Sequence, residues 1–342
     1  MRALRFWVGL WDLREHPRSL ALVRILMAAV LLWDLARVLQ LDLVVPLFGP
    51  LEAGGLGHPT GRKRPPVLYE LLPATEAGAF AAVLAAAVLS ATLMVGLLPR
   101  LSAALLVLLL AQLALVLPPA DRGIDMLVRN TLVVLAFSRC GDTLSLGARL
   151  RTGSWLGRAD ALVPAWPRLL LITQLVVLYF AAGVSKVASS WTPFGGWSAL
   201  YVAMRDPAFA RIDPTLLDQV YPLTQLGTVA TWLWEWGAPL LLLACWYRNT
   251  PDRPGRLRAW FNRVSFLHIY LLVGAIFHVG THLTLQLGIF PFAVLALYPA
   301  VFRPDEWRRW GGGLRGRLGG PGATEGAERG RMRDANPSQG PL

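Results

Sequence analysis

Long apolar runs separated by short polar segments dominate the chain. A helix that crosses a bilayer needs about 20 mostly apolar residues, and eight segments approach that requirement. They are residues 20–40, 78–98, 101–118, 125–140, 168–188, 224–246, 264–283 and 285–302. The pattern predicts an all-α fold, a polytopic integral membrane helix bundle with about eight transmembrane helices.

Three of these segments are weak as independent spans. Residues 125–140 are short and polar, so we expect them to pack inside the bundle. The last two segments come from one apolar run that is too long for a single span. Glycines between Gly280 and Gly288 interrupt this run, and we expect a tight hairpin or a re-entrant break there. A count of seven spans remains open.

The ends of the chain differ from the spans. Residues 1–19 place apolar and basic positions at helical spacing, which predicts an interfacial amphipathic helix rather than an export signal. Residues 20–302 form the predicted transmembrane domain. Residues 303–342 are basic and Gly-rich with almost no apolar residue, so we expect a disordered tail.

Composition supports a membrane protein. Hydrophobic residues make up 55% of the 342 residues and charged residues only 16%, whereas soluble domains are about a quarter charged. This balance argues against a soluble globular enzyme. Two cysteines are too few for a disulfide framework or a four-thiolate metal site.

The net charge of +12 would also suit a nucleic-acid-binding protein. With the N-terminus inside, however, the predicted inner segments hold 23 of the 33 Lys and Arg residues and the outer segments hold 6. Basic residues favour the cytoplasmic side of a membrane. We therefore expect cytoplasmic N- and C-termini, the lipid bilayer as partner, and no nucleic acid. The expected location is a bacterial inner (cell) membrane.

Ionisable groups inside predicted spans are the informative residues, because burying them in a membrane is costly. At a rise of about 1.5 Å per residue, several from five spans lie at mid-depth or in the predicted outer half. They are Asp34, Arg129 with Asn130, Lys186, Glu235, His278 and His282. We expect them to line one polar pocket that opens to the extracytoplasmic side.

Structural interpretations of the same charged residues remain open. Lys186 can extend to the outer headgroups beside interfacial tryptophans. Asp34 and Arg37 lie three residues apart and can neutralise each other. Glu235 is too deep to reach water easily, so it needs a proton or a basic partner. The candidate partners are Arg24, Arg129 and Lys186.

The histidines and tryptophans also allow two interpretations. His278 and His282 share a helix face, which can bind a metal only with a third ligand, and we expect no metal. Trp232 and Trp236 flank Glu235 together with Trp234. These rings can form the walls of a site for a flat ligand such as a quinone, or they can serve packing alone.

Two motifs carry a resemblance to a known family. YFAAGVSKVASSW is followed by GGW in residues 179–197, and FHVGTHLTLQLGIF occupies residues 277–290. In this order they resemble the HTTM (horizontally transferred transmembrane) family, the bacterial relatives of the membrane domain of vitamin K-dependent gamma-carboxylase. Arg24, Asp34 and Glu235 also resemble family positions.

The resemblance implies a chemistry. In the carboxylase, the lysine of the first motif is regarded as the base that deprotonates vitamin K hydroquinone. Lys186 would then be the base and His278 a hydrogen-bond donor to a quinone oxygen, with Glu235 as the third candidate catalytic residue. A reduced quinone, vitamin K hydroquinone or menaquinol, would be the cofactor. The candidate cofactor-binding residues are Arg129, Asn130, His282, Trp232 and Trp236.

Two departures from the carboxylase separate the function hypotheses. Asn130, Thr131 and Leu132 stand where the carboxylase has Asn-His-Ser, and the chain ends soon after the last predicted span, so we expect no large extracytoplasmic domain.

One hypothesis is a quinol-dependent oxygenase or carboxylase-like enzyme. A second is a non-enzymatic module that binds a lipid, a quinone or an exported peptide and assists maturation or secretion with a separately encoded partner. A third is a solute or ion carrier, for which the sequence lacks a clear internal repeat.

Overall fold

A computed structural model describes residue 9, residues 12–57, residues 67–307 and residue 309. The chain up to Val301 forms one helical unit, and a second unit begins at Phe302. The helices of the first half are α2 (Arg18–Gln40), α3 (Val44–Phe48), α4 (Val67–Leu71), α5 (Glu76–Val95), α6 (Pro99–Val116), α7 (Gly123–Phe137) and α8 (Leu146–Thr152). Those of the second half are α9 (Trp166–Ser185), α10 (Ala199–Arg205), α11 (Pro214–Gln219), α12 (Tyr221–Trp236), α13 (Pro239–Asn249), α14 (Arg256–Arg263), α15 (Phe266–Thr284) and α16 (Phe290–Leu295).

The remaining regular elements are short. The 3₁₀ turns are η1 (Leu51–Ala53), η2 (Pro118–Ala120), η3 (Ser189–Trp191), η4 (Pro193–Gly195) and η5 (Tyr298–Ala300). Two strands of two residues each, β1 (Arg14–Glu15) and β2 (Val163–Pro164), pair antiparallel. The predicted all-α class is confirmed for the part of the chain that the structure describes.

Five of the described helices are long and apolar enough to cross a membrane, namely α2, α5, α6, α9 and α15. They match five of the predicted spans closely. Large hydrophobic side chains on their outer faces remain exposed, as with Leu84 on α5, Leu108 on α6 and Ile276 on α15. Exposed apolar faces of this extent suit contact with lipid.

The other three predicted spans differ from the expectation. α7 is a helix of only 15 residues. The predicted span 224–246 is divided, because α12 ends at Trp236 and α13 begins at Pro239. Proline has no N–H, so the helix cannot continue its hydrogen bond to the Glu235 carbonyl. The predicted count of about eight spans and the orientation of the termini are not confirmed.

The predicted break in the last apolar run is present, and it comes directly after α15. Leu285 forms an isolated bridge with Ala210, and the Gln286 N–H donates to the Phe209 carbonyl over 2.8 Å. The backbone is therefore bonded to a distant loop where a helix would otherwise continue. Beyond the break, the six-residue α16 and then η5 stand in place of a full span.

The predicted N-terminal helix lies largely outside the described residues. Within the described part, Arg14–Glu15 form β1, and α2 begins at Arg18 after Pro17, so residues 1–19 are not one continuous helix. A proline disfavours helical backbone at the residue before it, here His16. Most of the predicted tail, residues 303–342, also lies outside the described residues.

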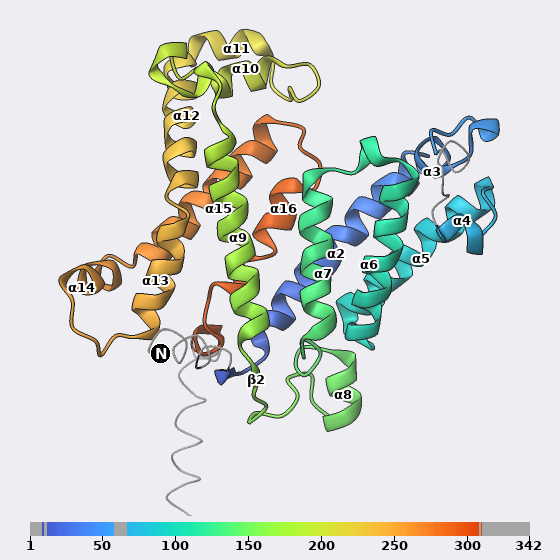
Figure 1. The fold of residues 1–342 in the computed structure, drawn as a ribbon, viewed down its shortest axis with the longest axis horizontal. Helices are drawn as coiled ribbons and strands as arrows, with labels where there is room; N and C mark the ends of the chain where they lie inside the picture. Colours follow the sequence, from blue (N-terminus) through green and yellow to red (C-terminus); the bar gives the residue numbers. More distant parts are fainter. Residues whose placement is uncertain (1–8, 10–11, 58–66, 308, 310–342) are drawn as a thin grey trace, which may run out of the picture. The chain divides into compact units, whose positions relative to one another are not determined.

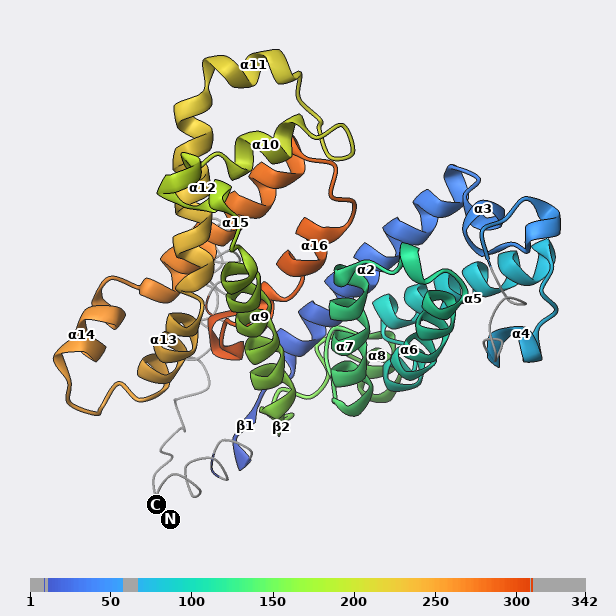
Figure 2. The same ribbon diagram turned by 45° about the horizontal axis from the view of Figure 1, so that its top comes forward.

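Two groups of helices make up the first unit (Figures 1 and 2). In the first group α2 packs on α5, α5 on α6, and α6 on α7; in the second, α12 packs on α9 and α10, and α13 on α9, α14 and α15. The groups meet where α7 contacts α9, and α16 and η5 contact α2. α10 and α11 lie across one end of α12, at the opposite end of the unit from α8.

A buried arginine joins α2 to the loop before α8. Arg24 is fully buried and donates from Nη1 to the Cys140 carbonyl over 3.3 Å and from Nη2 to the Leu144 carbonyl over 2.5 Å. Gly96, the left-handed C-cap of α5, allows this approach: a Cβ there would lie 2.3 Å from Arg24 Nη1. Gly96 is therefore required both by its backbone conformation and by the guanidinium beside it.

A largely buried ion pair, Arg168–Glu15, holds β1. Arg168, at the start of α9, donates from Nε to Glu15 over 2.7 Å and from Nη1 to the Ala300 carbonyl over 3.1 Å.

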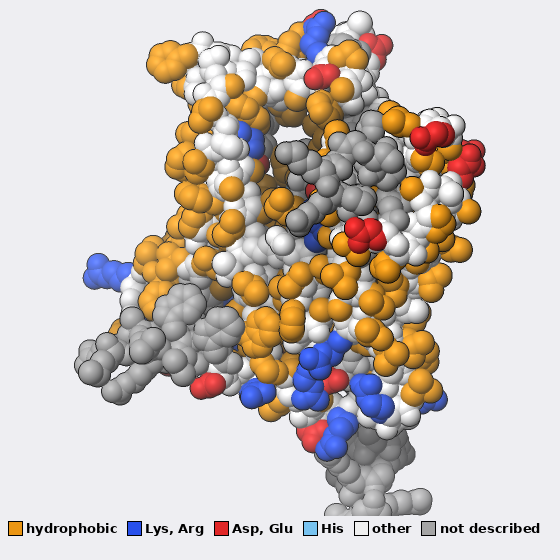
Figure 3. Space-filling view, turned by 45° about the vertical axis from the view of Figure 1, so that its right-hand side comes forward, with side chains coloured by type: hydrophobic (Ala, Val, Ile, Leu, Met, Phe, Trp, Pro, Cys, Tyr) orange, Lys and Arg blue, Asp and Glu red, His pale blue; other side chains and the backbone are white. Residues whose placement is uncertain are grey.

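On the face drawn in Figure 3, hydrophobic side chains cover the middle and basic side chains gather at the lower end. This is the end at which α8 lies.

Candidate functional site

The Lys186–Glu235 pair is the shortest ion pair among the described residues. Lys186 Nζ lies 2.5 Å from Glu235 Oε2, and the side chains are 17% and 6% exposed. Lys186 is the C-cap residue of α9, and Glu235 lies in the last turn of α12. Of the three partners expected for Glu235, the structure selects Lys186. Lys186 does not extend freely to headgroups.

A glycine sets the distance between the two helices at this pair. A Cβ on Gly183 would lie 3.1 Å from Glu235 Cβ and 3.1 Å from the Trp236 amide nitrogen. Glycine therefore lets α9 approach the backbone of α12 closely, one turn before Lys186. Lys186 Nζ also donates to the Ala182 carbonyl over 3.2 Å, and this hydrogen bond keeps the amine near the last turn of α9.

Tryptophans lie near both members of the pair in the chain or in space. Lys186 Nζ lies 4.9 Å from the centre of the Trp191 ring, a cation–π arrangement. Trp232 lies 5.8 Å from Trp197 and 5.7 Å from Trp236 between ring centres. Trp236 is exposed and Trp232 is half-buried, so both retain surface that a flat ligand can contact.

His278 lies in a hydrogen-bonded chain of buried side chains. Its Nε2 is 2.7 Å from the Tyr179 hydroxyl, which is 2.9 Å from the Tyr298 hydroxyl. The His278 side chain is fully buried, and Tyr179 occupies its Nε2. Its Nδ1 has no hydrogen-bond partner among the described residues. A hydrogen bond from His278 to a quinone oxygen, the role that the resemblance implies, would therefore have to come from Nδ1.

Trp234, the residue before Glu235, packs against this chain. Its ring centre is 4.4 Å from that of Tyr179, and its Nε1 donates to the Tyr270 carbonyl over 3.2 Å. Gly274 of α15 makes room, since a Cβ there would lie 2.0 Å from the Tyr298 hydroxyl and 2.6 Å from Trp234 Cζ2.

Sequence reasoning missed the roles of Tyr179 and Tyr298. Tyr179 begins the first motif in the sequence, and its hydroxyl stands alone in an apolar stretch of α9. A buried hydroxyl of this kind needs a hydrogen-bond partner, which is the signal that was available. The identity of that partner depends on tertiary structure.

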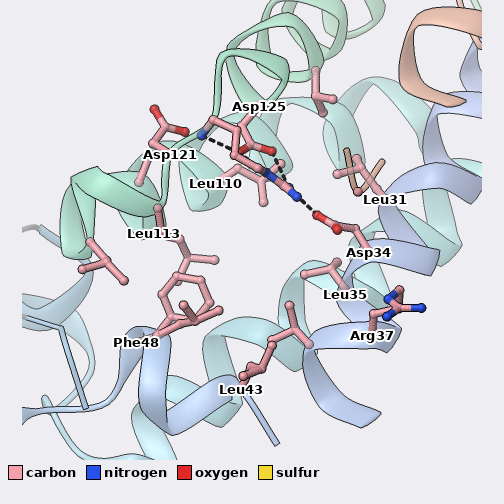
Figure 4. A pocket seen from close by; sticks show the side chains of 18 of the residues that line it. Leu31, Asp34, Leu35, Arg37, Leu43, Phe48, Leu110, Leu113, Asp121 and Asp125 are labelled. Carbon is pink, nitrogen blue, oxygen red and sulfur yellow. Dashed lines mark hydrogen bonds and ion pairs between the residues drawn. The ribbon is translucent and has the colours of Figure 1, made fainter. Parts of the chain in front are cut away.

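A separate cavity lies between α2, α3, α6 and α7 (Figure 4). Its volume is about 370 Å³, and leucine is the commonest residue in its wall, which also includes Phe48 from α3. On one side, Arg122 donates from Nη2 to Asp34 over 2.7 Å and to Asp125 over 2.8 Å. Figure 4 shows this bridge across the cavity wall, with Arg37 at a distance from it.

The bridge corrects one expectation. Asp34 is neutralised by Arg122, which is 88 residues away in the chain, and not by Arg37. Burial alone would lower the pKa of Arg122, but hydrogen bonds to Asp125 and Asp34 outweigh burial and raise that pKa above its ordinary value. The guanidinium therefore stays charged and links α2 to the start of α7.

Arg129 also lines this cavity and is bound at both ends of its guanidinium. Its Nη1 and Nη2 donate to the two oxygens of Asp121 over 2.7 and 2.8 Å. Asn130, the next residue, is exposed. The planar two-point contact fixes the loop between α6 and α7.

The expected single pocket is therefore divided in the structure. Asp34 and Arg129 line the cavity of the first helix group, whereas Lys186, Glu235 and His278 lie among α9, α12 and α15. Depth along a span places residues at one level but does not give the direction of their side chains, which explains the error.

His282 joins neither group. Its ring packs edge-on against Phe292 with ring centres 4.6 Å apart, and its carbonyl accepts from Arg211. Within the described residues, no group of three or more His, Cys, Asp or Glu side chains is arranged to hold a metal ion.

Comparison with known proteins identifies the family. A family model, the HTTM domain, matches residues 14–243. No curated protein and no solved structure matches the chain. The matched range contains Lys186 and Glu235 and ends before His278. Together with the five long apolar helices, this match shows that the chain is an integral membrane protein that belongs to the HTTM family.

Proposed function

We propose that the protein is a membrane enzyme in which Lys186 accepts a proton from a reduced quinone, in chemistry like that of vitamin K-dependent gamma-carboxylase. The observation that carries the proposal is the 2.5 Å contact between Lys186 and the more deeply buried Glu235. Family membership supports it, because both residues lie in the matched range.

A base must be unprotonated before it acts. Movement of one proton from Lys186 Nζ to Glu235 Oε2 produces a neutral amine and a neutral carboxylic acid. The net charge of the pair stays zero in this step, so the apolar surroundings do not oppose it as they would oppose a lone charge. Lys186, with 17% of its side chain exposed, is the member of the pair that a ligand can reach.

The side chains present fit a flat aromatic cofactor. Trp191 offers a ring face beside the amine, and Trp232 and Trp236 lie in the last turns of α12 around Glu235. These rings would hold the cofactor ring by stacking. When bound, a reduced quinone would supply the reducing electrons for oxygen chemistry. Tyr179 and His278 would act on the site through Trp234, as positioning residues.

The test uses purified protein in lipid nanodiscs with menaquinol or vitamin K hydroquinone. Binding of the quinol should quench the tryptophan fluorescence of the wild-type protein. The wild-type protein should also consume oxygen. Lys186→Arg keeps the positive charge but cannot supply a neutral amine near neutral pH. We expect this variant to bind the quinol and to lose about 100-fold or more in oxygen consumption, a typical loss when a general base is removed.

Arg211→Lys is the matched control, because it alters a basic side chain of a loop without touching the pair. It should leave both binding and turnover unchanged. The proposal is wrong if wild-type protein binds neither quinol, or if Lys186→Arg and Lys186→Ala consume oxygen at the wild-type rate.

A second candidate function rests on the cavity of α2, α6 and α7. Its leucine wall and its edge of ion pairs suit an amphiphile that is bound without reaction, as a lipid- or peptide-handling module requires. Leu113→Trp would fill this cavity, whereas Leu115→Trp on the same helix adds the same ring at an exposed position. Loss of a copurifying apolar ligand in the first variant alone would favour this function.

A further inference from the structure

Another cavity lies between the end of α13, the end of α14 and the start of α15. Its volume is about 340 Å³. Arg248 comes from the end of α13, Asn262 from the end of α14, and Ser265 and His268 from the start of α15. None of the described residues that line it is acidic. Nothing in the proposed quinol chemistry uses this cavity.

The surroundings of the cavity are strongly basic. Residues 247–264 contain five arginines and a single carboxylate, Asp252. Arg258 of α14 is 6% exposed, and its guanidinium lies 5.2 Å from the Trp246 ring and 5.1 Å from the Tyr247 ring. Its Nε and Nη1 have no hydrogen-bond partner among the described residues. Arg258 does not line the cavity, but no ion pair with a carboxylate is found for it among the described residues, so its guanidinium adds positive charge to the surroundings.

The start of α15 adds hydrogen-bond donors to the lining. Ser265, its N-cap residue, makes no side-chain cap hydrogen bond. Phe266 and Leu267, the first residues of this 19-residue helix, line the cavity. The first N–H groups of a helix lack partners within the helix and favour an anion. Arginine, serine and these N–H groups are the donors that bind phosphate.

Apolar residues beside the cavity indicate the source of the phosphate. Trp246 and Trp260 are 37% and 52% exposed, and Leu257 of α14 is 53% exposed. Tryptophans with exposed faces beside arginines are typical of the membrane–water interface. Phe261, Phe266 and Leu267 form the apolar part of the cavity wall. A ligand with a phosphate and an acyl chain matches both parts.

We propose that this cavity binds the phosphate headgroup of an anionic phospholipid, with Arg248 and the start of α15 as its donors. The acyl chains extend along the apolar wall at Phe266 and Leu267. The bound lipid holds α13, α14 and α15 together at one end of the second helix group, where α14 contacts both neighbours.

The test measures thermal unfolding of the detergent-purified chain with phosphatidylglycerol, with phosphatidylcholine, and with inorganic phosphate. A ligand that binds only the folded state raises the unfolding temperature in a saturable manner. We expect phosphatidylglycerol to do so and the other two to have little effect. Arg248→Gln should weaken the response to phosphatidylglycerol about tenfold, the usual scale for a charge-assisted hydrogen bond.

Arg253→Gln is the matched control. It removes the same charge from an exposed position in the loop that follows α13, outside the cavity lining. The proposal is overturned if both variants weaken the response equally, or if phosphatidylcholine stabilises as well as phosphatidylglycerol. It is also overturned if inorganic phosphate alone gives the full effect, which would identify a site for free phosphate.

A measurement on the wild-type chain covers the case in which Arg248→Gln does not fold. A photoreactive phosphatidylglycerol should cross-link to peptides within residues 244–268. Cross-links that fall only elsewhere in the chain would contradict the proposal. Neither experiment depends on quinol binding, so failure here leaves the proposed enzyme function intact.

Discussion

Removing Lys186 should destabilise the protein more than removing Glu235. The charges lie 2.5 Å apart, and with an effective dielectric constant of about 20 their attraction is about 7 kcal/mol before the cost of desolvation. Glu235 is 6% exposed and cannot reach water, whereas Lys186 is 17% exposed and sits at the end of its helix on a flexible side chain. Lysine can extend to solvent when its partner is lost.

We therefore expect Lys186→Met to lower the free energy of unfolding by about 3–4 kcal/mol, because it leaves a buried carboxylate alone. Glu235→Met should cost only about 1–2 kcal/mol, because the lysine reorients. In the double variant two apolar side chains of similar volume replace the pair, and the free energy of unfolding should return to within about 1 kcal/mol of the wild-type value.

Equilibrium unfolding in mixed micelles, followed by circular dichroism, measures all four proteins of this double-mutant cycle. The exposed Arg205–Asp218 pair, with N–O distance 2.7 Å and side chains 42% and 58% exposed, is the control cycle. Solvent screens it, so we expect no measurable coupling there. Equal losses in the two single variants, or a double variant as unstable as the sum of both, would refute the reasoning.

Three further predictions concern packing and accessibility. Gly274→Val should cost about 1–3 kcal/mol and shift the Trp234 fluorescence, because its side chain would collide with Tyr298 and Trp234; Gly280→Val on the same helix meets no atom within 4 Å and is the control. Arg168→Gln should destabilise the fold by about 2–3 kcal/mol and speed hydrogen exchange in β1, because Glu15 and the Ala300 carbonyl lose their donor. Burial raises the pKa of the Cys140 thiol, so less thiolate forms at neutral pH; in a Cys245→Ser chain, maleimide labelling should be slow until the protein unfolds, and equally fast labelling of the folded protein would contradict the buried position.

Hydropathy predicted the long helices well and the broken ones poorly. α2, α5, α6, α9 and α15 are uninterrupted apolar runs, so a window of about 20 residues finds them. The run 224–246 is also largely apolar, but Gly237 and Pro239 divide it. Average hydropathy ignores the missing N–H of one proline, which ends the helix beside Glu235.

The candidate site was predictable as a set of residues but not as a set of pairs. A buried carboxylate requires a cation or a proton, so the sequence limits the partners of Glu235 to a few. The choice of Lys186 depends on Gly183, which brings α9 against α12. Spacing along one helix did not predict the ion-pair partner of Asp34, because that partner, Arg122, comes from the start of another helix. Contacts between helices require the direction of each side chain, which depth along a span does not contain.

The separation of the two polar groups limits what each can do chemically. The cavity of α2, α6 and α7 holds Arg122 and Arg129 with their aspartates. Arginine does not release its proton under ordinary conditions, so these pairs can hold charge and orient a ligand but cannot act as a base. Lysine and glutamate can exchange a proton over 2.5 Å without changing the charge of their pair. If the protein performs proton-transfer chemistry, that chemistry therefore belongs at Lys186, and the cavity can serve it only by binding.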